Sequence, residues 1–315
     1  MIELQVVSIA APVSRLARGT TMTGSVHSVF TRSVNLLAGN ALITLTDGSS
    51  GNQPNGICCR FEGMPLPMLF QQGDLFHLGH EALLFPDKNM VACLTQATVW
   101  EPDCPMLNRL TVETGARRLV RWLEDHSDFL TSYPHLRWLW DRLYSFSPLP
   151  IQGDPWIFHF ADSIENMIHA VENAAWADAL ASAKNLLGLG IGLTPSGDDF
   201  LLGFFTAGQT LGPWDVMDHL VSQIADSAPQ RSPLVSATFL HALSQRQISE
   251  RFGSLLAALN CPDPELLDTA AISMLHYGSS SGMDTMFGLL FGIQTFIGSN
   301  FHQQSKEILW KLAQS

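Results

Sequence analysis

Two segments in the second half of the chain carry the residues best suited to chemistry. The first is GLGIGLTPSGDDFLLG at 188–203, and the second is HYGSSSGMDTMFGLL at 276–290. They align without gaps, pairing Ser196 with Ser281, Gly197 with Gly282, Asp199 with Asp284 and Gly203 with Gly288. Apolar residues follow in both, as they do where a loop leads into a buried helix. The sequence therefore predicts two related loop-to-helix junctions.

Each junction combines carboxylates with hydroxyls and loop amides. A carboxylate suits a general base or the orientation of an amide N–H, and amides at a helix N-terminus suit an anion. We expect both N-termini to face one pocket. The catalytic candidates are Asp198, Asp199 and Asp284. The substrate-binding or anion-binding candidates are Gly192, Thr194, Ser196, Gly197, Ser280, Ser281 and Gly282.

A purely structural interpretation of these segments stays open. Glycines end a helix, Ser196 or Thr194 would cap the next one near Gly197, and acids in a first turn favour the helix dipole. The first segment is not a Walker loop, because no Gly-Lys-Ser/Thr follows, and the helix before it excludes the Rossmann pattern. Met283 stands where the first segment has Asp198, so the two junctions cannot be chemically equivalent.

Outside these segments no metal site is predicted. Five cysteines without Cys-x-x-Cys spacing indicate neither zinc nor a disulfide framework. We interpret the arginines at 109–142 as a solvated face and a set of scattered histidines as structural. Those histidines are His27, His77, His80, His159, His241 and His276. No cofactor is predicted, although magnesium on the aspartates remains an alternative for a phosphotransfer enzyme.

The elements that would position these residues divide the chain near residue 105. Short strands are predicted at 25–30, 41–45, 56–61, 82–85 and 91–100. Helical spacing follows at 111–127, 134–144, 162–187, 200–210, 214–225, 234–242, 247–259, 264–275 and 285–296, with a proline-rich linker at 145–155. The fold class is therefore α+β, with a β-rich small sandwich or barrel at 1–105 and an all-helical domain at 106–315.

Composition narrows the class of protein further. The chain has 315 residues, 46% of them apolar and 15% charged, against about 25% charged in an average domain. A net charge of −12 argues against nucleic-acid binding, and no apolar run is long enough for a membrane span. The N-terminus lacks the charge order of a signal peptide, so we expect a cytoplasmic protein. Because few residues are charged, we expect part of the apolar surface to be covered by partner subunits or by other copies of the chain in a homo-oligomer.

The acidic stretch around the first segment constrains its ligand. Between residues 143 and 230 the only Lys or Arg is Lys184, whereas ten residues are Asp or Glu. A small anionic substrate there would depend on backbone amides, hydroxyls and arginines from elsewhere.

The string GLTPSGDD at 192–199 and the segment GSSSGMD at 278–284 resemble the AllH family. The VHSVF and NLL strings near residues 26–37 are similar to its opening strands. The resemblance implies a subunit of oxamate carbamoyltransferase in allantoin degradation, which forms oxamate and carbamoyl phosphate from oxalurate and phosphate together with two further subunits. An alternative is a non-catalytic assembly or regulatory subunit with an anion-binding site.

Overall fold

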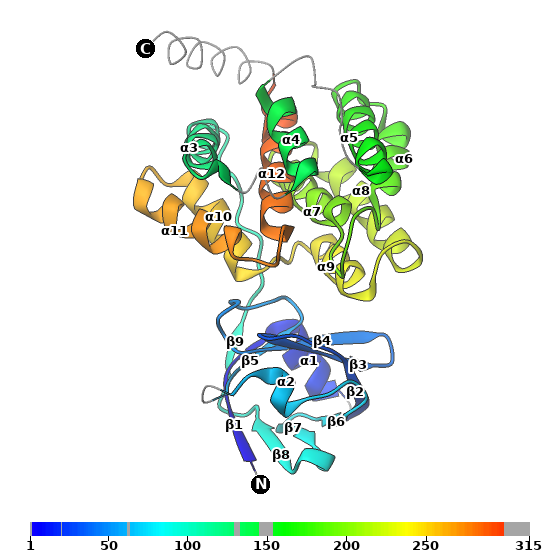
Figure 1. Cartoon of the computed structure of the whole chain (residues 1–315), viewed down its shortest axis with the longest axis vertical. Helices are drawn as coiled ribbons and strands as arrows, with labels where there is room; N and C mark the ends of the chain where they lie inside the picture. Colours follow the sequence, from blue (N-terminus) through cyan, green and yellow to red (C-terminus); the bar gives the residue numbers. More distant parts are fainter. Residues whose placement is uncertain (1, 20, 62–63, 129–132, 145–153, 299–315) are drawn as a thin grey trace. The chain divides into compact units, whose positions relative to one another are not determined.

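The computed structural model describes residues 2–19, 21–61, 64–128, 133–144 and 154–298 (Figure 1). The chain forms two compact units, the first from Met1–Cys104 with Arg246–Gly253 and the second from Pro105–Gln245 with Ser254–Ser315. The sequence placed the segment 246–253 in the helical domain. In the structure it belongs to the first unit, because its backbone forms hydrogen bonds with residues of that unit. Cys104 N donates to Arg246 O, and Ile248 N donates to Pro102 O.

The first unit is a closed β-barrel. Its strands are β1 (Ile2–Ala10), β2 (Met22–Val29), β3 (Ser33–Ala38), β4 (Ala41–Thr46), β5 (Gly56–Arg60), β6 (Leu75–Leu78), β7 (Ala82–Phe85), β8 (Met90–Cys93) and β9 (Thr98–Trp100). They run in the order β5-β4-β3-β2-β6-β7-β8-β1-β9, and an antiparallel β1–β5 pairing closes eight of them into a ring. The predicted sandwich or barrel is therefore a barrel, with β9 added parallel to β1.

Buried apolar side chains fill this barrel. Leu36, Leu45, Phe76 and Phe85 are fully buried within one cluster. Two helices accompany the strands, α1 (Ala11–Gly19) and the short α2 (Leu66–Leu69), and a 3-10 turn spans Pro86–Lys88. The strand predicted at 91–100 is wrong as a single element, since β8 and β9 are separated by a turn.

The second unit is helical within the described residues. Its helices are α3 (Val112–Asp125), α4 (Pro134–Tyr144), α5 (Pro155–Glu172), α6 (Trp176–Leu186), α7 (Ser196–Leu211), α8 (Trp214–Ser227), α9 (Leu234–Ser244), α11 (Pro264–Leu275) and α12 (Ser281–Ile297). A 3-10 turn spans Ala228–Gln230, and α10 (Glu250–Asn260) contains the division between the units. No described helix is long and apolar enough to cross a membrane.

The predicted single helix at 162–187 is wrong, because the structure has two helices there. The helix α5 begins earlier, at Pro155, and ends at Glu172, where Asn173 N bonds back to His169 O. Ala174 then adopts a left-handed backbone with φ of 53°, which no helix interior contains. The predicted linker at 145–155 lies outside the described residues as far as residue 153.

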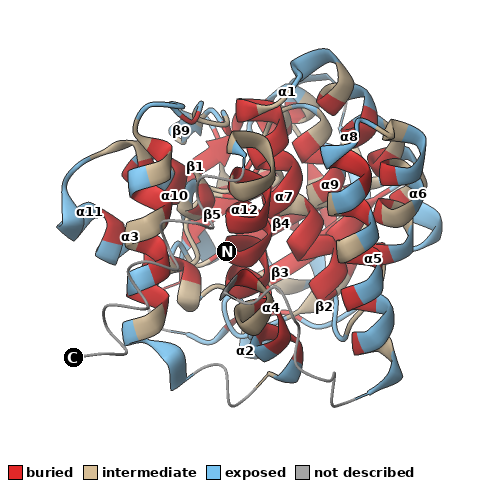
Figure 2. Ribbon diagram, turned by 90° about the horizontal axis from the view of Figure 1, so that it is seen from above, coloured by how far each residue is buried: buried red, intermediate tan, exposed pale blue. Residues whose placement is uncertain are grey.

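The central pair of the helical unit is α7 and α12, which are buried along almost their whole length (Figure 2). They run parallel and very close. A Cβ atom on Gly203 would overlap Thr285 O, and one on Gly288 would overlap Phe200 O. Because the two contacts are reciprocal across the aligned segments, the sequence repeat is a structural repeat, with both helix N-termini on the same side.

Candidate functional site

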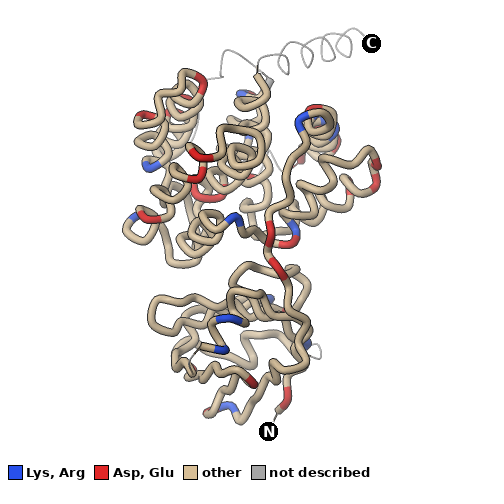
Figure 3. Tube along the Cα trace, turned by 180° about the vertical axis from the view of Figure 1, so that it is seen from behind, with Lys and Arg blue, Asp and Glu red and all other residues tan. Residues whose placement is uncertain are grey.

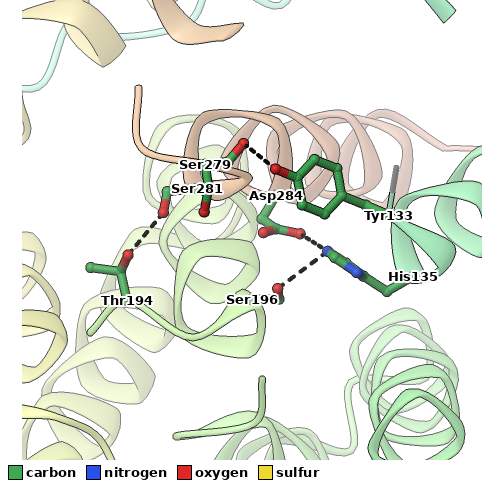
Figure 4. A network of polar contacts seen from close by, with 7 residues as sticks. All are labelled: Tyr133, His135, Thr194, Ser196, Ser279, Ser281 and Asp284. Carbon is green, nitrogen blue, oxygen red and sulfur yellow. Dashed lines mark hydrogen bonds and ion pairs between the residues drawn. The ribbon is translucent and has the colours of Figure 1, made fainter. Parts of the chain in front are cut away.

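The two loops that precede α7 and α12 are joined by side chains. Thr194 Oγ1 lies 2.8 Å from Ser281 Oγ (Figure 4). The approach to α7 is built from Gly188, Gly190 and Gly192, whose φ angles of 75°, 129° and 96° place them in backbone regions that favour glycine. This bond places the two helix N-termini beside each other, while the predicted shared pocket stays a prediction.

A histidine from α4 enters the same region. This residue is His135. Its Nε2 lies 3.0 Å from Asp284 Oδ1 and 3.2 Å from Ser196 Oγ (Figure 4). In a Ser-His-Asp relay the acid and the serine occupy opposite ring nitrogens, whereas here both face one nitrogen. The arrangement is therefore a buried polar pair with a serine beside it, and it does not activate Ser196 as a nucleophile in the manner of a triad.

Aromatic side chains enclose His135. The ring centroids of Trp156 and Phe160 lie 5.2 Å and 6.0 Å from its imidazole. Tyr133 packs beside it and donates its hydroxyl to Ser279 O at 3.1 Å, which attaches the start of α4 to the loop before α12. The imidazole is held in a largely apolar wall, and its polar contacts point to α7 and α12.

The aligned acids Asp199 and Asp284 form the buried centre of the site. Asp284 is fully buried and Asp199 nearly so. Burial, followed by the charge of Asp284, holds the pKa of Asp199 well above its ordinary value, while hydrogen bonds from Ser281 and Thr194 oppose that rise. The Oδ2 atom of each carboxylate finds no hydrogen-bond partner among the described residues. Two buried acceptors thus lack donors.

Asp198 has a different environment from its neighbour. Its Oδ1 accepts from Gly188 N and Ser232 Oγ, both at 2.9 Å, and its Oδ2 accepts from Ser236 Oγ at 2.7 Å. Burial raises the pKa of Asp198, and these three bonds oppose the rise. The carboxylate of Asp198 has partners on both oxygens and ties the glycine loop to the start of α9, which distinguishes its bonding from that of the other two acids.

The predicted capping and amide-binding roles differ from what the structure shows. The N-cap of α7 is Pro195, without a side-chain bond, so neither Ser196 nor Thr194 caps it. A proline has no side-chain oxygen that could accept from the helix amides, and the hydroxyls of Thr194 and Ser196 bond to other elements instead. Gly197 N already donates to Leu189 O, and Gly282 N already donates to Tyr277 O.

The remaining predicted residues lie at the edge of the site. Gly192 is exposed in the loop with open space around it, and Ser280 is the half-buried N-cap of α12, again without a side-chain cap bond. Ser281 and Ser196 are buried. The structure therefore brings Thr194, Ser196 and Ser281 to the acids and leaves Gly192 at a distance from their contacts.

Charged side chains are sparse along the helical unit, where most of the trace is neither acidic nor basic (Figure 3). Several arginines of the 109–142 group are engaged locally. Arg117 pairs with Glu113, Arg137 with Asp141, Arg142 with Glu165, and Arg118 donates to Cys261 O and Pro262 O. No cluster of three or more His, Cys, Asp or Glu suited to a metal ion occurs among the described residues.

His135 was not among the histidines considered from sequence. It stands 61 residues before Ser196 and 149 before Asp284, so no local spacing connects it to either. The one available signal is its position just after Pro134, in the first turn of a predicted helix, where the proline fixes the backbone.

The fold and the site define a class of protein with an N-terminal β-barrel, a helical unit built on a repeated helix pair, and a buried acid–hydroxyl–histidine network. Family models match both parts, one described as the AllH family N-terminal domain over residues 5–99 and one as oxamate carbamoyltransferase subunit AllH over 186–293. The chain belongs to the AllH family. No solved structure matches it.

Proposed function

We propose that this chain is a subunit of an oxamate carbamoyltransferase and that its α7–α12 junction takes part in carbamoyl transfer. One observation carries the proposal. The two family segments place Asp199 and Asp284 side by side in a buried region, together with three hydroxyls and an imidazole. Buried acids with perturbed pKa values gather at catalytic centres more often than elsewhere. The family's description as an oxamate carbamoyltransferase subunit supports carbamoyl transfer as the reaction.

The reaction proposed is the exchange between oxalurate with phosphate and oxamate with carbamoyl phosphate. A phosphate oxygen bonds to the carbamoyl carbon, and the bond from that carbon to the inner nitrogen of oxalurate breaks. The leaving nitrogen gains one proton and becomes the amide of oxamate, while the attacking phosphate loses one. The proton that phosphate loses therefore equals the proton that the leaving nitrogen gains, so the reaction balances.

Asp199 is suited to move that proton. Its raised pKa favours the carboxylic acid form, so Asp199 is proposed to protonate the leaving nitrogen, and the proton that phosphate loses restores the acid afterwards. Asp284, whose Oδ1 faces His135, is proposed to orient the transferred group. Ser196, Ser281 and Thr194 are proposed to hold its carbonyl oxygen.

Replacement of Asp199 in the reconstituted complex tests the proposal. Asp199→Asn keeps the shape of the side chain and removes its proton transfer, so we expect turnover of oxalurate with phosphate to fall at least about tenfold. Asp215→Asn is the matched control, because it is also an acid in the first turn of a helix but lies exposed on α8. Equal turnover of wild type and Asp199→Asn, with both folded, would remove the catalytic role.

A second candidate is a non-catalytic assembly or regulatory subunit. The observation that favours it is the complete burial of Asp284 against His135, which an internal polar network needs no substrate to explain. Assay of the partner subunits with and without this chain separates the two functions. Full phosphorolysis by the partners alone would support the second candidate, and dependence on both the chain and Asp199 would support the first.

A further inference from the structure

We infer that the acid pair Asp199 and Asp284 receives the N–H groups of a primary carboxamide or ureido end, –CO–NH₂, and does not bind the anionic end of the substrate. This inference rests on the proposed function and specifies which part of the substrate the site reads. It departs from the expectation from sequence that amides at the helix N-termini bind an anion, and it develops the expectation that a carboxylate there orients an amide N–H.

Five of the first-turn backbone donors that an anion would need already donate within the chain. In α7, Gly197 N donates to Leu189 O, and the amides of Asp198 and Asp199 donate to Pro195 O. In α12, Gly282 N donates to Tyr277 O and Asp284 N donates to Ser280 O. An anion-binding helix N-terminus depends on amides that have no such partners. These five amides are therefore not available to an oxyanion at the two N-termini.

The acceptors are what remain unused. Asp199 Oδ2 and Asp284 Oδ2 are buried and have no hydrogen-bond partner in the described part of the chain. A buried acceptor without a donor is costly, so these two oxygens call either for one proton shared between the acids or for N–H donors of a ligand. A terminal –NH₂ carries two donors in one plane, which matches a pair of neighbouring acceptors.

The charge of the region points in the same direction. The acids at this centre are Asp199 and Asp284, with Asp198 close enough to act on Asp199, and the basic group bonded into it is His135. Bringing a further carboxylate or phosphate against buried acids is unfavourable, whereas a neutral –CO–NH₂ group adds no charge. Its carbonyl oxygen would accept from the reorienting hydroxyls of Thr194, Ser196 or Ser281.

A pair of matched ligands tests the inference by isothermal titration of the full chain. Oxamate and pyruvate are both monoanions of nearly equal size, and they differ in having –NH₂ or –CH₃ on the carbonyl carbon. We expect wild type to bind oxamate at least about tenfold more tightly than pyruvate, because the methyl group leaves both acceptors without donors. Equal affinity for the two ligands, or no binding of either, would overturn the inference.

Variants assign the preference to the acid pair. Asp199→Asn and Asp284→Asn each place an –NH₂ of their own against the ligand, so we expect the preference for oxamate to shrink by several-fold, while Asp215→Asn retains it. A preference that survives in both folded site variants overturns the assignment. The result is separable from the proposed function. An oxamate preference that depends on Asp199, with turnover unchanged in Asp199→Asn, keeps the ligand assignment and removes the catalytic one.

Discussion

His135 Nε2 lies 3.0 Å from Asp284 Oδ1, so a buried imidazole on α4 meets a buried carboxylate at the start of α12. Both side chains are nearly or completely removed from water. Such a pair gains little overall, since the attraction offsets the desolvation of both groups, but the loss of one partner leaves the other stranded. The contact therefore secures the position of α4 beside the acid pair.

Removal of the imidazole should destabilise the chain. His135→Ala leaves Asp284 without its partner and opens a cavity beside Trp156 and Phe160, so we expect a loss of about 3–5 kcal/mol in the free energy of unfolding. Urea unfolding followed by circular dichroism measures the change. His276→Ala is the control, because that exposed side chain bonds, among the described residues, to Ile272 O one turn back, and its loss should cost under about 1 kcal/mol. A similar small cost for His135→Ala would contradict the structural role of the pair.

The raised pKa of Asp199 predicts an unusual dependence of stability on pH. In the unfolded chain this carboxyl ionises near its ordinary value of 3.8, whereas in the folded chain it keeps its proton to a higher pH. Between these two pKa values the folded state binds more protons, so stability falls as pH rises through that window. The groups that face Asp199 are Asp284 and Asp198, with His135 bonded to the former.

Asp199→Asn should remove this contribution, because an amide does not titrate. We expect urea midpoints measured from pH 4.5 upward to decline less steeply with pH in the variant than in wild type. Asp215→Asn, exposed on α8, should follow the wild-type slope. Parallel profiles for wild type and Asp199→Asn would mean that the carboxyl titrates normally in the folded chain.

The reciprocal contacts of Gly203 and Gly288 predict that neither position accepts a side chain. A methyl group at either site would overlap a backbone carbonyl of the opposite helix, and backbone cannot move as a flexible side chain does. We expect Gly203→Ala and Gly288→Ala each to destabilise the chain by about 1–3 kcal/mol or more, measured by urea unfolding. Gly19→Ala, at an exposed position with nothing within 4 Å, should have little effect. Tolerance of both central substitutions would refute the close parallel packing.

The sequence predicted the elements whose signals are local. Prolines, glycines and apolar periodicity placed α4, α11 and most other helices closely, and the repeated segments predicted both the equivalence of Asp199 and Asp284 and their meeting. The break at Ala174 escaped because a left-handed alanine has no compositional signal. Barrel closure through β1 and β5 joins strands about fifty residues apart, which no local pattern reports.

The site itself was predicted only in part, because sequence shows which residues are present and tertiary contacts decide how they meet. Hydroxyls and acids in two aligned strings are visible in sequence, but the direction of each side chain is decided by tertiary contacts. Asp198 and Asp199 are adjacent and chemically identical, yet Asp198 accepts from one amide and two serines while Asp199 is left with an unused acceptor. His135 reaches the site only through the packing of α4 against α12.

The saturation of Asp198 leads to a prediction that separates it from its neighbour. Asp198→Ala would strand three donors, Gly188 N, Ser232 Oγ and Ser236 Oγ, and would release the glycine loop from the start of α9. We expect a loss of about 2–4 kcal/mol in the free energy of unfolding, because the stranded amide is fixed while the hydroxyls can turn to other acceptors. The Ser232→Ala/Ser236→Ala double variant should lose less, since it leaves only unmet acceptors on a carboxyl that can take up a proton. If Asp198→Ala retained full stability while abolishing oxamate binding, Asp198 would instead belong with Asp199 and Asp284 as a ligand-contacting acid.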